Sequence, residues 1–146
     1  MAHNKFKKFS VVYRKWKILE KREQMILAQI LKEKQIVAKE TERLQRQIKE
    51  NYEELEKKPQ SFVYAYSQME SHHFSLKKEQ GKLLPLEEKV QESYKNLANY
   101  QQNIKNLEKS LNKLKEEIKR EEERKEYEKL EENFRNYSFS LSLDKS

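Results

Sequence analysis

Apolar residues recur every three or four positions along most of the chain. Stepping by seven from residue 62 to residue 118 meets an apolar side chain each time: Phe62, Met69, Leu76, Leu83, Val90, Leu97, Ile104, Leu111 and Ile118. A companion row three residues further on is mostly apolar between Leu86 and Leu114. Since this a/d pattern exceeds the three or four repeats that define a coiled coil, it predicts a long coiled-coil helix.

The first third of the chain shows the same helical spacing. Its apolar row is Phe9, Val12, Trp16, Leu19, Ile26, Ile30 and Val37, and the acidic residues Glu23 and Glu33 interrupt it. The phase then slips by four residues between Val37 and Thr41 and resumes at Leu44, Ile48, Tyr52 and Leu55. An inserted four is a stutter, so the supercoil is expected to relax there.

Two segments could reverse the chain: residues 57–61, which include Pro59, and residues 81–85, which begin with Gly81 and end with Pro85. Residues 57–61 are favoured because a five-residue loop suits two antiparallel helices. The leucines around Pro85 then continue the apolar row past a proline kink. The predicted order is a first helix over about 5–57, a turn at 57–61, a second helix over about 61–135 with a kink near 81–85, and a flexible C-terminal tail over 136–146. A turn at 81–85 stays the alternative.

The predicted fold is therefore all-α: residues 1–135 form a long antiparallel two-helix coiled-coil hairpin, a rod with no globular core. Composition agrees, because 39% of the 146 residues are charged, 35% are hydrophobic, and one glycine and two prolines leave little material for turns. The chain has no cysteine, which excludes disulfides and thiolate chemistry. Apolar runs of about four residues predict neither a transmembrane helix nor a secretory signal.

Positive charge is concentrated at the start of the chain. The first 22 residues carry eight Lys or Arg side chains and one acidic residue, Glu20, so they hold the whole net charge of +7. Residues 116–132, in contrast, carry nine Glu and five Lys or Arg. Mixed charge on the rest of the chain suits solvated helix faces. The basic start instead indicates a docking surface for an acidic partner.

Candidate catalytic chemistry is sparse. His72 and His73 are adjacent, so on a helix they diverge by about 100° and cannot chelate one ion; neither a metal nor a cofactor is predicted. The glutamate clusters lack the desolvating pocket that a general acid needs, and the chain is expected not to be an enzyme. Phe6, Phe9 and Trp16 alternate with cations and could stack on nucleic acid, but their spacing also suits packing between helices.

The order of these features resembles a known family. The chain opens with Phe6-x-x-Phe9-x-x-Val12-x-Arg14, followed by Leu19-Glu20-Lys21-Arg22-Glu23. A long Glu/Lys/Gln-rich coil, a short break and an aromatic restart, Phe62-Val63-Tyr64-Ala65-Tyr66, come next. Over nearly the whole chain this resembles the flagellar export protein FliJ family and, more distantly, the YscO-type stalk proteins of type III secretion. The family's acidic C-terminal ending is absent here.

The resemblance implies a non-catalytic stalk of a flagellar or type III export apparatus. Such a stalk inserts into and stimulates a hexameric, FliI-like export ATPase, contacts a FlhA-like export gate protein, and captures export chaperones. The implied location is the cytoplasm, peripherally at the inner membrane, with the chain monomeric by itself. The ATPase contact is assigned to the basic start of the first helix: Lys5, Lys7, Lys8, Arg14, Lys15, Lys17, Lys21 and Arg22. The gate contact is assigned to the hairpin tip: Ile48, Tyr52, Phe62, Tyr66, Met69 and His73.

Two other functions fit the same sequence. One is a generic coiled-coil scaffold that homodimerises and has no ATPase partner. The other is a nucleic-acid-binding protein that uses the basic start as an arm. Self-association separates the first from the stalk, because a hairpin that satisfies its own seam is expected to be monomeric.

Overall fold

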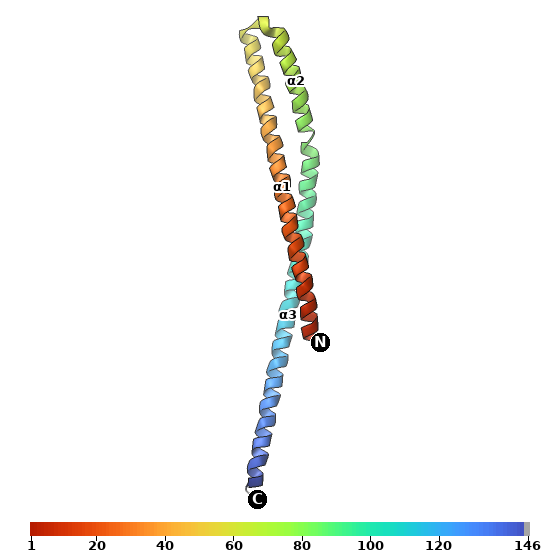
Figure 1. Ribbon diagram of the computed structural model, residues 1–146, viewed down its shortest axis with the longest axis vertical. Helices are drawn as coiled ribbons and strands as arrows, with labels where there is room; N and C mark the ends of the chain where they lie inside the picture. Colours follow the sequence, from red (N-terminus) through yellow and green to blue (C-terminus); the bar gives the residue numbers. More distant parts are fainter. Residues whose placement is uncertain (145–146) are drawn as a thin grey trace. The chain divides into compact units, whose positions relative to one another are not determined.

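The computed structural model describes the backbone of residues 1–144 and the side chains of residues 1–60 and 62–142. Its elements are helix α1 (Ala2–Lys57), the short 3₁₀ helix η1 (Pro59–Ser61), helix α2 (Phe62–Gln80) and helix α3 (Leu83–Asp144) (Figure 1). The described residues contain no strand, and the prediction of an all-α helical hairpin is confirmed. Contacts divide the chain into two compact units, the hairpin unit (residues 19–99) and the terminal unit (residues 1–18 with 100–146).

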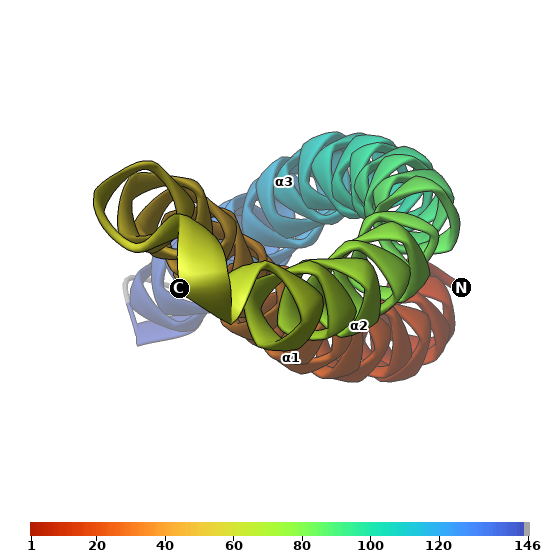
Figure 2. The ribbon, with the colours of Figure 1, turned by 90° about the horizontal axis from the view of Figure 1, so that it is seen from above.

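The chain reverses at Pro59, and the preceding residue explains why α1 ends at Lys57. A residue before proline is disfavoured in the α region, and Lys58 accordingly has φ −134° and ψ 80°. The Lys58 amide still donates to the Glu54 carbonyl at 2.8 Å, which completes the last turn of α1. Pro59 then begins η1. The first residue of a helix has no intrahelical partner for its amide hydrogen, so proline loses no hydrogen bond there. Figure 2, which looks down on this turn, shows η1 joining the end of α1 to the start of α2.

The hairpin unit buries a narrow apolar seam between α1 and the returning chain, by which we mean α2 and the part of α3 up to residue 99. Its buried apolar side chains are Val37, Leu44, Ile48, Ala65, Met69, Leu86, Val90 and Leu97. The last five of these come from the two heptad rows that contain Met69 and Leu86, as their spacing predicts. Lys34 on α1 also pairs with Glu87 on α3 at 2.5 Å, beside this seam.

The seam of α1 follows most of the row that apolar spacing predicts, since Phe9, Trp16, Leu19, Ile30 and Val37 are buried or partly buried, but it departs from that row at two positions. Val12 and Ile26 are exposed, whereas Tyr13 and Leu27 are partly buried. The seam runs through Glu23 because this side chain faces Asn96 across the hairpin. Buried and partly buried positions then continue in regular steps of three and four through Lys34, Val37, Thr41, Leu44, Ile48, Asn51 and Leu55, so the stutter predicted between Val37 and Thr41 is wrong.

The second helix is divided in two, where a kink was predicted. Pro85 lacks an amide hydrogen, and its ring crowds the carbonyl four residues earlier, at Gly81. Helix α2 therefore ends at Gln80, and the Lys82 amide makes a tighter bond to the Glu79 carbonyl at 3.0 Å. Because α3 begins at Leu83, Pro85 lies in its first turn, where amide hydrogens have no partner within the helix.

The terminal unit pairs the start of α1 with α3. The Trp16 and Tyr100 rings lie 5.6 Å apart, and Ile104 and Leu114 are buried. Helix α3 continues to Asp144, so residues 136–144 of the segment predicted as a flexible tail are helical; residues 145–146 lie outside the described part. No glycine or proline follows Pro85, and helix propagation is cooperative once started.

Candidate interaction surfaces

The basic start of α1 forms a cationic surface. All eight predicted side chains are exposed: Lys5, Lys7, Lys8, Arg14, Lys15 and Lys17 in the terminal unit, and Lys21 and Arg22 in the hairpin unit. They occupy the sides of the helix that the seam leaves free, so packing requires none of these charges. The Lys17 ammonium lies 5.8 Å from the centre of the Tyr13 ring, a cation–π contact on the same helix.

The aromatic residues among these cations serve packing within the terminal unit. Trp16 contacts Tyr100, and the Tyr13 hydroxyl donates to the Glu108 carboxylate at 3.1 Å. Phe6 and Phe9 are partly buried on the same side of α1. Since these rings face α3, their stacking surfaces are not presented beside the exposed lysines. This arrangement favours the packing interpretation over base stacking.

The six residues predicted for the hairpin tip separate into two groups. Ile48 and Met69 are each only 7% exposed, because they fill the seam between α1 and α2. Tyr52, Phe62 and Tyr66 are each more than half exposed, and His73 is also exposed. Only the second group can meet a partner without opening the helices.

Four aromatic residues and one valine beside the turn are exposed, and we call this set the tip patch: Tyr52, Phe62, Val63, Tyr64 and Tyr66. Val63 and Tyr64 are exposed, although helical spacing did not select them. The Phe62 and Tyr66 rings stack with centres 5.8 Å apart, and the Gln68 side-chain amide donates to the Tyr64 hydroxyl at 2.7 Å. The sequence signal for Val63 and Tyr64 was the unbroken run Phe62–Tyr66, because five consecutive residues cover every side of a helix.

Polar groups also lie inside the hairpin unit. The Asn51 side-chain amide nitrogen lies 3.0 Å from His72 Nδ1, and Asn96 donates to the buried Glu23 carboxylate at 3.4 Å. Each pair joins α1 to the returning chain. Among the described residues, no three His, Asp or Glu side chains converge as metal ligands.

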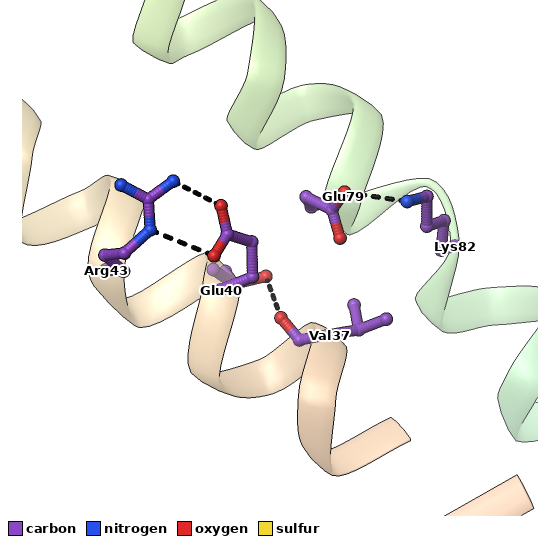
Figure 3. A network of polar contacts seen from close by, with 6 residues as sticks. Val37, Glu40, Arg43, Glu79 and Lys82 are labelled. Carbon is purple, nitrogen blue, oxygen red and sulfur yellow. Dashed lines mark hydrogen bonds and ion pairs between the residues drawn. The ribbon is translucent and has the colours of Figure 1, made fainter. Parts of the chain in front are cut away.

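A groove of about 830 Å³ lies between α1 and the junction of α2 with α3. Figure 3 shows four of its charged groups in two pairs: Arg43 Nε donates to Glu40 at 2.9 Å, and Lys82 pairs with Glu79 at 2.7 Å. The Arg43 hydrogen bond lowers the pKa of the Glu40 carboxyl. A general acid at neutral pH requires the opposite shift, so Glu40 acts here as an ionised partner of Arg43.

Comparisons with known proteins return no match among family models, curated proteins or solved structures. Within the described part of the chain, no helix combines the length and apolarity needed to cross a bilayer.

Proposed function

We propose that this chain is a non-catalytic stalk of a flagellar or type III protein export apparatus. Its basic start of α1 inserts into a hexameric export ATPase and stimulates it. Its tip patch contacts the export gate protein, and the helices capture export chaperones. In this role the protein is cytoplasmic and is held peripherally at the inner membrane by its partners.

The observation that carries the proposal is the exposed cationic surface at the start of α1. Like charges one turn apart, such as Lys5 with Lys8, destabilise a helix by a few tenths of a kcal/mol per pair. Crowding these cations does not stabilise the packing between the helices, because other residues fill the seam. A partner channel lined with carboxylates would offset that cost and would also speed docking by electrostatic steering.

The tip patch supports the second contact. Several exposed aromatic side chains gather beside the turn, and aromatic residues dominate the energetic centres of protein interfaces. The basic start opens α1, whereas the tip patch has Tyr52 near the end of α1 and its other four residues on α2. The basic start is cationic, and no residue of the tip patch is charged. They therefore suit two chemically different partners.

The test is an ATPase assay with the cognate export ATPase. The purified chain is expected to hydrolyse no nucleotide alone and to raise both hexamer assembly and turnover of the ATPase. The charge-reversal variant should abolish stimulation, and its substitutions are Lys5→Glu, Lys8→Glu, Lys15→Glu and Arg22→Glu. The matched control reverses three exposed lysines and one exposed arginine later on α1, and its substitutions are Lys32→Glu, Lys39→Glu, Arg46→Glu and Lys49→Glu.

Helicity should be nearly unchanged in both variants, since Glu and Lys have similar helix propensities. Binding of the unaltered chain should weaken as salt rises, because exposed charges are screened over about 8 Å at physiological ionic strength. Equal stimulation by the charge-reversal variant and the unaltered chain at low salt would exclude this surface as the ATPase contact. Nucleic acid would then be tested as its partner by a salt-dependent mobility shift.

A further inference from the structure

The last part of α3 carries an apolar stripe that nothing in the described chain covers. Residues 121–142 are all exposed, and five apolar side chains among them follow steps of three and four: Tyr127, Leu130, Phe134, Tyr137 and Leu141. Their exposed fractions run from 43% to 70%. Residues at this spacing form one face of a helix, so they make a continuous seam of a coiled coil that lacks its second helix.

This stripe, which we call the C-terminal stripe, does not prolong the seam that α3 shares with α1. The intramolecular row passes through Leu111 and Ile118 and would next reach Lys125 and Glu132, which are charged. The C-terminal stripe is out of phase with that row by two residues.

Charge is arranged unevenly around the C-terminal stripe. Glu126 and Glu131 lie within about a quarter turn of its midline, one on each side, and Glu123 lies on the midline one turn before Tyr127, as calculated from 3.6 residues per turn. The basic residues of the same segment, Arg124, Lys125, Lys129 and Arg135, all lie further round the helix. The face that the stripe presents is therefore apolar along its middle and acidic at its edges.

We propose that the C-terminal stripe is a docking site for an amphipathic helix of another protein, one with apolar a and d positions and basic flanking positions. Charge complementarity selects this occupant over a parallel second copy, which would place Glu126 opposite Glu131 of its partner. The inference is independent of the ATPase contact, because it uses none of the cations at the start of α1.

The probe is a labelled three-heptad peptide with Leu at a and d and Lys at e and g, titrated with the full chain by fluorescence anisotropy. Two comparison peptides each carry one change: the first has Glu in place of Lys at e and g, and the second has Gln in place of Leu at a and d. The Lys-flanked Leu peptide is expected to bind at least about tenfold more tightly than either. Binding should also increase amide-exchange protection over residues 121–142.

Matched variants test whether the peptide binds at the C-terminal stripe. Phe134→Ser should weaken binding at least about tenfold, whereas Phe139→Ser should change it less than about twofold, because Phe139 is equally exposed but lies on the opposite side of α3. The double variant Glu126→Lys with Glu131→Lys should weaken binding more than Glu128→Lys with Glu132→Lys. Each double variant adds the same charge and removes one glutamate paired with an arginine four residues away, Glu131 with Arg135 in the first and Glu128 with Arg124 in the second.

Three results would overturn the proposal. They are equal binding of the Lys-flanked and Glu-flanked peptides, equal effects of the paired variants, and sedimentation showing that the unaltered chain dimerises while Phe134→Ser does not. The charge variants keep the test decisive if Phe134→Ser loses helicity, since they retain the apolar stripe.

Discussion

Polar side chains occupy several seam positions that a coiled coil ordinarily gives to apolar residues. Glu23 and Asn51 are buried with partners on the facing helix, Asn96 and His72. Buried polar pairs in a coiled-coil seam fix register at some cost in stability. Ser93 differs, because it is almost completely buried and its hydroxyl oxygen has no hydrogen-bond partner.

Replacing Ser93 by alanine is therefore expected to stabilise the fold. The substitution removes an unsatisfied buried hydroxyl, whose desolvation costs about 1–3 kcal/mol. It also gains about 0.5 kcal/mol of helix propensity, which Ser67→Ala on the exposed side of α2 isolates as a control. Urea unfolding should show a larger increase in the free energy of unfolding for Ser93→Ala than for Ser67→Ala. An equal or smaller increase would mean that the Ser93 hydroxyl is satisfied in solution.

Burial explains which single-residue predictions from the sequence succeeded. The seam of α2 and α3 was traced correctly because its rows are dense in large apolar residues, from Met69 to Leu114. On α1, Val12 and Ile26 were assigned to the seam although Tyr13 and Leu27 occupy it. The spacing of α1 placed Glu23 on the row as an interruption, but it could not show that Asn96 faces this carboxylate across the hairpin.

At the scale of elements, local chemistry determined the helix ends. A proline and the residue before it restrict the backbone whatever the tertiary context, so the end of α1 beside Pro59 followed from sequence. The sequence predicted a flexible tail after residue 135, yet α3 continues to Asp144. A window of a few residues missed the longer period of three and four that begins at Tyr127.

The break between α2 and α3 gives a prediction at this scale. Gly81 has no positive φ, and a Cβ atom there would meet the Lys77 and Lys78 carbonyl oxygens at an ordinary 3.4 Å. Gly81→Ala should therefore raise the free energy of unfolding by about 0.5–1 kcal/mol, because it restricts the unfolded chain without straining the folded one. Thermal unfolding followed by circular dichroism checks the increase. A decrease would show that the junction needs a glycine conformation in solution.

At the scale of the whole molecule, the sequence predicted helices and charge better than surfaces. The basic start of α1 could be located by counting charges, because its charged side chains stay exposed whichever face of the helix forms the seam. The tip could not, because Ile48 and Met69 share the spacing of their exposed neighbours but fill the seam. Which side chains remain for a partner depends on which ones the facing helix covers.

The proposed stalk has two surfaces whose effects should be separable. Tyr52→Ala with Phe62→Ala removes exposed aromatic area at the tip patch and should weaken binding to the export gate protein at least about tenfold. Stimulation of the export ATPase should stay within about twofold of the unaltered chain, since the cations of α1 are untouched. The charge-reversal variant at Lys5, Lys8, Lys15 and Arg22 should show the opposite result, with gate binding kept and stimulation lost.

The matched control for the tip is Tyr94→Ala with Phe74→Ala, which removes one exposed tyrosine and one exposed phenylalanine away from the patch. Surface plasmon resonance with the gate protein and a coupled ATPase assay measure the two activities on the same preparations. If both aromatic pairs weaken gate binding equally, general hydrophobicity explains the contact and the tip has no special role. If the tip variant also abolishes ATPase stimulation, the two surfaces serve one partner, and the division of roles along α1 is wrong.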